Sequence, residues 1–118
     1  MEINKPKPLE KTTLWDKLCL FNDYFNPHII AELNGQRVNL IKFKGTFIWQ
    51  IHENEDKLFI VILGKFTMQF RNRNILVSRG ELLVVPRGTE YCPFAEDEAW
   101  LMVIEPAATS NQVVANKD

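Results

Sequence analysis

The sequence predicts an all-β protein, a barrel or sandwich of short strands with one short helix before it. Two observations predict this fold class. Short apolar or alternating segments, which are typical of strands, recur along the chain, and only one early segment has helical spacing. Turn residues separate these segments at Asn34-Gly35, Gly64, Gly80 and Pro86-Arg87-Gly88. With 118 residues the chain suffices for one core, so we expect a single domain.

The first expected element is a short helix in the segment TTLWDKLCLFNDYF. Its apolar residues recur at intervals of three and four between Leu14 and Phe25, and Thr12 or Thr13 is placed to cap the first turn. Pro27 then ends the segment, because proline has no backbone N–H to donate. We therefore expect a helix over Leu14–Phe25 that packs across a sheet.

The strands begin with a hairpin. HIIAEL and QRVNLIKF flank Asn34-Gly35, a dipeptide that tolerates the positive φ angles of a two-residue type I′ turn. Further strands are expected at Thr46–His52, Lys57–Leu63, Lys65–Phe70, Asn74–Ser78, Glu81–Val85, Tyr91–Ala95 and Trp100–Glu105.

These elements divide the chain into three parts. Residues 1–26 form an N-terminal arm with the short helix, residues 27–106 form the barrel, and residues 107–118 form a flexible tail. The tail is predicted because AATSNQVVANKD is small and polar.

Charge and composition exclude several classes of partner. With 14 basic and 15 acidic residues the formal net charge is −1, which favours neither nucleic acid nor an anionic membrane surface. The amino-terminal segment MEINKPKPLEKTT lacks the apolar core of a signal peptide, and no apolar run approaches the ~18 residues of a membrane span. The two cysteines form no CxxC pair. We therefore expect a cytoplasmic protein without nucleic-acid or membrane partners.

The order of turns and strands resembles the small single-domain cupins, whose two motifs are written G(X)5HXH(X)3-4E(X)6G and G(X)5PXG(X)2H(X)3N. The resemblance extends from PHIIAELNGQ through FIWQIHENEDKLF and GELLVVPRG to EAWLMVIEP. Gly64, Gly80 and the turn Pro86-Arg87-Gly88 match the motif spacing. The resemblance implies a cupin double-stranded β-helix, also called a jelly-roll barrel.

In this family two histidines, a glutamate and a third histidine bind a divalent metal inside the barrel. The matching positions here are Gln50, His52, Lys57 and Tyr91, so only His52 keeps a strong donor. Two unit charges at ~4 Å and an effective dielectric of ~20 interact by about 4 kcal/mol, and an ammonium repels a divalent ion by roughly twice that. We therefore expect no metal and no other cofactor.

Asp56 could replace Lys57 as a ligand, because the motif allows three or four residues after the second histidine. With Asp56 as the ligand, seven residues separate it from Gly64, whereas the motif has six. The period of two along a strand also puts Asp56 on the face opposite Lys57. A metal-dependent cupin with an atypical site, or residual transition-metal binding, stays open as an alternative.

Two classes of function follow from these residues. The first is a metal-independent binding or regulatory module in which Gln50, His52, Lys57 and Tyr91 line a pocket for a small anion, such as a carboxylate or a sugar acid. Lys57 would then replace the metal as cationic centre. The second is a metal-independent enzyme, isomerase-like or epimerase-like, that transfers protons among His52, Tyr91 and Lys57. His28 matches no ligand position and is expected at an edge or facing solvent.

The strand LFIVIL is apolar on both faces. If Lys57, Phe59 and Val61 face the lumen, then Leu58 and Ile60 face outward and need cover. LLVV and WLMVI repeat this pattern, and one short helix is too small to cover three strands. We therefore expect a homodimer through the outer sheet face, as is common in the resembled family.

Overall fold

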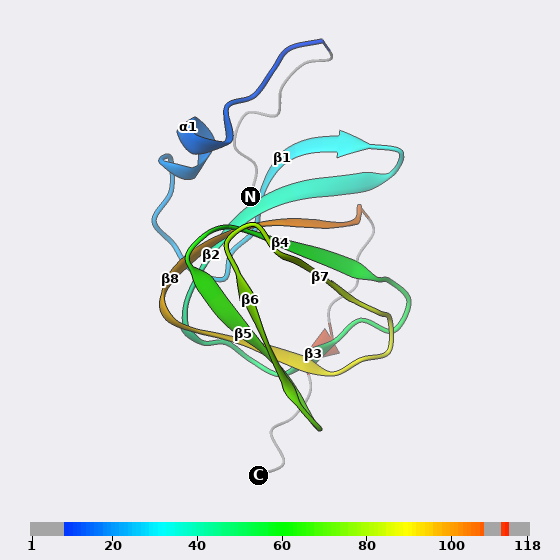
Figure 1. The fold of residues 1–118 in the computed structure, drawn as a ribbon. Helices are drawn as coiled ribbons and strands as arrows, with labels where there is room; N and C mark the ends of the chain where they lie inside the picture. Colours follow the sequence, from blue (N-terminus) through cyan, green and yellow to red (C-terminus); the bar gives the residue numbers. More distant parts are fainter. Residues whose placement is uncertain (1–8, 108–111, 114–118) are drawn as a thin grey trace.

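The fold is an all-β barrel in which one long strand pairs with four others. A computed structural model describes residues 9–107 and 112–113. The elements are α1 (Leu14–Leu18), β1 (His28–Leu33), β2 (Gln36–Thr46), β3 (Gln50–Ile51), β4 (Lys57–Leu63), β5 (Lys65–Phe70), β6 (Asn74–Ser78), β7 (Leu82–Val85), β8 (Tyr91–Pro106) and β9 (Gln112–Val113). Figure 1 shows α1 and the β1–β2 hairpin at one end of the barrel and the β5–β6 hairpin at the opposite end.

All strand pairs are antiparallel, and β8 is the hub of the barrel. Its first part pairs with β3 and β5, its second part pairs with β4, and β2 pairs with it from Phe94 to Pro106. The pairs β1–β2, β4–β7 and β5–β6 complete the walls. This arrangement confirms the predicted jelly-roll barrel. The two strands predicted at Tyr91–Ala95 and Trp100–Glu105 are one continuous strand, and the residues between them form an irregularity where the register with β2 shifts between Phe43 and Gly45.

The lumen is filled by side chains that alternate along each strand. On β4, Phe59 and Val61 are buried in this core, whereas Leu58 and Ile60 on the other face are half-buried. The alternation follows from the period of two of an extended chain. The core comprises Ile41, Phe43, Phe59, Val61, Phe66, Met68, Val77, Val85, Tyr91, Ala95, Ala99, Leu101 and Val103.

A second, smaller core lies outside the barrel beneath the N-terminal segment. Leu18, Phe21, Ile30 and Leu40 are buried there. The helix is shorter than predicted: α1 ends at Leu18, and the chain leaves the helix after the N–H groups of Cys19 and Leu20 donate to the carbonyl oxygens of Trp15 and Lys17. Phe25 has a φ of +58°, and its backbone N–H donates to the Lys42 carbonyl oxygen over 2.8 Å. The residues with helical spacing beyond Leu18, Phe21 and Phe25, therefore pack against the barrel from an irregular segment rather than from a helix.

This segment also buries His28, so of the two places expected for His28 the edge of the sheet is right and the solvent-facing position is wrong. The side chain is 1% exposed, and its ring stacks on Phe21 with 3.9 Å between centroids. His28 Nε2 lies 2.8 Å from Asp23 Oδ1. The chain between α1 and β1 folds back over the start of β1, which a strand pattern alone does not indicate.

The turns that required glycine are present. Asn34 and Gly35 have φ angles of +51° and +76°, which confirms the predicted hairpin turn. Gly64 has a φ of +79°, and a Cβ atom there would lie 2.7 Å from the carbonyl oxygen of Glu98. Close approach of β8 and left-handed backbone both demand glycine at this position.

Other boundaries also differ from the prediction. The expected strand Thr46–His52 is divided, because β2 continues to Thr46 and β3 contains only Gln50–Ile51. Within the predicted tail, β9 pairs with β3, and the rest of residues 108–118 lies outside the described residues, as do residues 1–8 of the arm. Across the described ranges, no helix is long and apolar enough to cross a membrane.

Candidate functional site

A cavity of about 250 Å³ opens into the barrel, and all four predicted site residues line it. Gln50 and His52 come from β3 and the residue after it, Lys57 from the start of β4, and Tyr91 from the start of β8. The strand pairs bring these segments to one end of the lumen. The polar side chains of the lining are Arg37, Asn39, Gln50, His52, Lys57, Tyr91 and Glu105.

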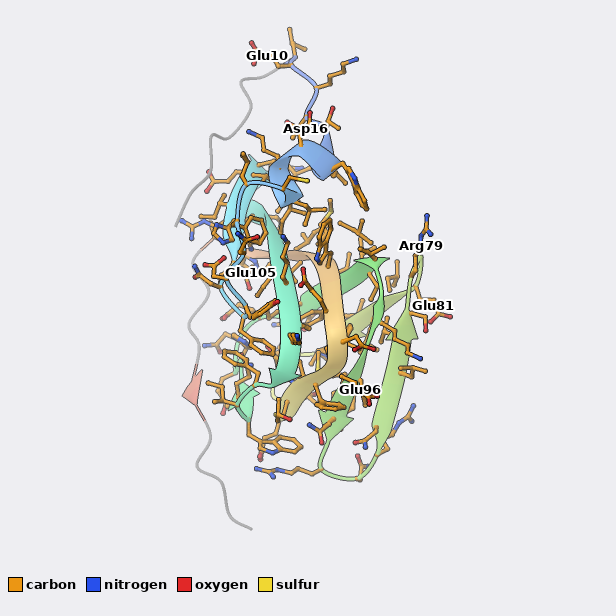
Figure 2. The ribbon with its side chains drawn as sticks, turned by 90° about the vertical axis from the view of Figure 1, so that its left-hand side faces the viewer. Glu10, Asp16, Arg79, Glu81, Glu96 and Glu105 are labelled. Carbon is orange, nitrogen blue, oxygen red and sulfur yellow. The ribbon has the colours of Figure 1, made fainter. Side chains whose placement is uncertain are left out.

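Four charged residues of alternating sign form a row across β1, β2, β8 and β4, and the last three of them line this cavity. Glu32 on β1 pairs in register with Arg37 on β2, and Arg37 pairs with Glu105 on β8. Leu58 pairs with Ile104, which places Lys57 of β4 beside Glu105. We call Glu32, Arg37, Glu105 and Lys57 the charge row. Figure 2 shows Glu105 near β1 and β2, on the opposite side of the molecule from Arg79 and Glu81.

Lys57 is paired with a carboxylate inside the barrel. Its Nζ lies 2.9 Å from Glu105 Oε1, and the two side chains are only 14% and 13% exposed. Lys57 Nζ also lies 3.5 Å from His52 Nε2. The second oxygen of Glu105 accepts a hydrogen bond from Asn39 Nδ2 over 3.1 Å. A buried charge is stable only when it is paired or hydrogen-bonded, and both conditions hold here.

Sequence reasoning missed Glu105 and Arg37, although a signal for each was present. Leu101 and Val103 are buried lumen residues, and the strand period of two puts Glu105 on their face. The same period carries Arg37 onto the face of Asn39, which the hairpin pattern could have shown. That Glu105 contacts Lys57 depends on the β4–β8 register, which no local pattern encodes.

Gln50 and Tyr91 face each other across the β3–β8 pair. The Tyr91 hydroxyl donates to Gln50 Oε1 over 3.4 Å, and its ring stacks on His52 at 5.8 Å between centroids. Burial, and next the negative charge of Glu105, raise the pKa of Tyr91 well above its usual value. The phenol therefore stays protonated and serves as a hydrogen-bond donor.

The rest of the cavity is apolar and aromatic. Phe25 stacks on Phe47 with 4.4 Å between centroids and 2° between planes, and on Phe43 at 5.0 Å. All three rings line the cavity. Phe25 reaches this wall from the N-terminal segment, so residues far apart in sequence shape one surface. The cavity combines a charged mouth with an aromatic wall formed by Phe25, Phe43 and Phe47.

The donor set does not fit a divalent metal. The Lys57 ammonium lies between the two strongest candidate ligands, at 2.9 Å from Glu105 and 3.5 Å from His52, where it would repel a cation. In the described part of the chain, no group of three or more His, Cys, Asp or Glu residues is arranged to hold a metal. Asp56 instead accepts a hydrogen bond from the Arg87 backbone N–H over 2.8 Å, in an exposed turn.

Comparisons with known proteins agree with the barrel and its motifs. No protein-family model matches the chain. The uncharacterised protein YdbB of Bacillus subtilis (strain 168) is 34% identical over 76 residues, which cover 61% of this chain and 67% of YdbB.

Two solved structures are similar over most of their length. A cupin-2 domain containing protein from Shewanella frigidimarina NCIMB 400 is 40% identical, with a TM-score of 0.79 over 80% of this chain and 93% of that chain. Protein NMB1881 from Neisseria meningitidis is 27% identical, with a TM-score of 0.76 over 83% of this chain and 100% of that chain. Identity at this level over nearly a whole cupin-2 domain shows that the chain belongs to the cupin family.

Proposed function

We propose that this cupin is a metal-independent module that binds a small organic acid in the lumen. The observation that supports this proposal is the replacement of a metal-ligand set by hydrogen-bond donors around Lys57. The positive centre is kept, whereas the donors that a metal requires are missing from three of the four positions. Binding of this kind suits a regulatory or carrier role.

The cavity offers a carboxylate several charge-assisted contacts. The Lys57 ammonium and the terminal nitrogens of Arg37 are cationic donors, and the Tyr91 hydroxyl and the amide of Gln50 are neutral ones. Hydrogen bonds to charged groups contribute ~1.5–3 kcal/mol each, so two or three of them give micromolar to millimolar affinity. A cavity of about 250 Å³ lies just below the roughly 300–1,000 Å³ of drug-sized pockets, which favours a small ligand.

The alternative of an enzyme that transfers protons among His52, Tyr91 and Lys57 has less support. The Lys57–His52 distance of 3.5 Å would allow proton exchange. However, burial raises the pKa of Tyr91, so this phenol is a poor acid at neutral pH. General acid catalysis works best when the pKa of the acid lies near the working pH. Binding therefore explains the site better than proton transfer does.

A thermal-shift and calorimetric screen of small carboxylates and sugar acids tests the proposal. At least one acid should raise the melting temperature of the parent protein and lose its effect on Lys57→Met, which keeps the bulk of the stem and removes the charge. Lys65→Met is the matched control, because Lys65 is exposed on β5 away from the cavity. Equal binding by parent and Lys57→Met would show that Lys57 takes no part.

A further inference from the structure

Glu105 gives the cavity a negative group that a site for simple anions does not need. It projects from β8 between two cationic strand neighbours, Arg37 on β2 and Lys57 on β4. A ligand carboxylate that contacts Lys57 must also come close to Glu105, because only 2.9 Å separates Lys57 Nζ from Glu105 Oε1. Like charges at that separation repel. A bare carboxylate is therefore only partly complementary to this site.

The position of Glu105 is fixed rather than adaptable. Lys57 contacts one carboxylate oxygen and Asn39 donates to the other over 3.1 Å. Asn39 itself is 1% exposed, so its amide has little freedom to move away with Glu105. The negative charge consequently remains at the mouth of the cavity when a ligand enters.

We infer that the cavity prefers a zwitterion of the α-amino-acid class, with its carboxylate on Arg37 and Lys57 and its ammonium on Glu105. This inference rests on the proposed function and names the ligand class. The positive Lys57 Nζ and the negative Glu105 Oε1 lie 2.9 Å apart. In an α-amino acid the carboxylate and the ammonium are also adjacent. A full negative charge on Glu105 favours an ammonium over a neutral hydroxyl group.

The aromatic wall indicates which kind of side chain the amino-acid ligand carries. Phe25, Phe43 and Phe47 form a stacked wall of the cavity that Arg37, Lys57 and Glu105 also line. An apolar or aromatic side chain on the ligand gains burial and ring contacts against that wall. We therefore expect apolar amino acids to bind more tightly than glycine.

Matched probes that share one carbon skeleton test this inference by calorimetry on the full chain. The sets are glycine, acetate and methylamine; leucine, isocaproate and isoamylamine; and phenylalanine, hydrocinnamate and phenethylamine. In at least one set the amino acid should bind the parent about tenfold more tightly than the acid or the amine. In Glu105→Gln the preference should disappear, because the acid gains affinity and the amino acid loses its partner. Glu96→Gln is the control, since it removes an exposed acid of β8 outside the cavity.

The outcomes separate the two proposals. If in every set that binds the parent the acid or the amine binds as tightly as the matching amino acid, the zwitterion preference is overturned, and the binding of organic acids stands wherever an acid binds. If Glu105→Gln keeps the full preference, Glu105 is not its cause and the inference is again overturned. If no amino acid in any set binds the parent, this inference fails, and the proposed function is decided separately by the wider screen of carboxylates and sugar acids. The comparison on the parent alone remains decisive if Glu105→Gln does not fold.

Discussion

The two faces of the sheet formed by β2, β4 and β8 each hold a lysine that is largely removed from water. On the outer face, Lys42 is 3% exposed, donates to the Phe21 carbonyl oxygen over 2.7 Å and lies 4.3 Å from the centroid of the Trp100 ring. On the lumen face, Lys57 lies beside Glu105 and His52 at the mouth of a cavity. The residue type and the degree of burial are similar, but the surroundings differ.

The difference shows that burial alone does not identify a functional lysine. The partners of Lys42 are a backbone carbonyl and two aromatic rings, which belong to the fold and which no ligand can replace. The partners of Lys57 are side chains on the wall of a cavity, so a ligand can share or replace them. Lys42 therefore attaches the N-terminal segment to the barrel, whereas Lys57 is available for binding.

The largest expected effect concerns the outer face that the N-terminal segment leaves uncovered. Leu82 and Val84 on β7 are 61% and 51% exposed, and they pair in register with Ile60 and Leu58 of β4. We propose that a second copy of the chain covers this surface. Light scattering at micromolar concentration should give twice the chain mass of 13.8 kDa, and a micromolar dimer corresponds to about 8 kcal/mol.

The double variant Leu82→Lys, Val84→Lys should be monomeric, because two ammonium groups cannot be buried unpaired in an apolar interface. Leu76→Lys is the matched control: Leu76 is 57% exposed on β6, outside the proposed interface. A monomeric parent, or a dimer that survives the double variant, would remove this proposal.

Much of this fold was predictable because its determinants are local. The Asn34-Gly35 turn and the strand β4 follow from turn chemistry and from the period of two, and both were predicted with their observed bounds. The helix was predicted too long because Phe21 and Phe25 have helical spacing, although they come from an irregular segment and pack against the outer core and the lumen core, respectively. Glu105 was missed because its contact with Lys57 depends on the pairing of β4 with β8. Local sequence patterns predict on which face of a strand a side chain lies, whereas contacts within the site also depend on the register between paired strands.

The next effect concerns metal binding in the lumen. Dialysed parent protein should hold well under one equivalent of Fe, Mn, Ni, Cu or Zn, and added metal should leave its melting temperature unchanged. The triple variant Gln50→His, Lys57→Glu, Tyr91→His should gain about 4 kcal/mol of stability at a metal concentration a thousandfold above Kd. Stoichiometric metal in the parent would show that the site is metal-dependent. A triple variant that binds no metal would show that these positions do not correspond to the family's ligands.

A smaller effect is expected when Lys42 is truncated. Lys42→Ala removes a charge-assisted hydrogen bond, two cation–π contacts and the packing of the stem, so the free energy of unfolding should fall by about 2–4 kcal/mol. Urea unfolding measures this change. Lys44→Ala, two residues further along β2 and exposed, should change it by less than about 0.5 kcal/mol. Equal effects of the two variants would show that Lys42 is not a structural attachment.

The smallest effect is a pH dependence that reports how dry the lumen is at Tyr91. Burial raises the pKa of Tyr91 in the folded protein, whereas in the unfolded chain the phenol ionises near its ordinary value of about 10. The free energy of unfolding is therefore unaffected by Tyr91 ionisation below about pH 10. As the pH rises further, it falls by up to about 1.4 kcal/mol per pH unit, because the unfolded chain releases a proton that the folded protein keeps. Unfolding free energies from urea titrations at several alkaline pH values should show this slope in the parent and a shallower one in Tyr91→Phe. Tyr24→Phe should change the slope less than Tyr91→Phe does, because Tyr24 is exposed and the pKa of its hydroxyl is raised mainly by a hydrogen bond to Glu98 rather than by burial. Ultraviolet absorbance should show Tyr91 ionising only as the protein unfolds; reversible ionisation of Tyr91 in the folded state near pH 10 would mean that water reaches the phenol and that the lumen is wet.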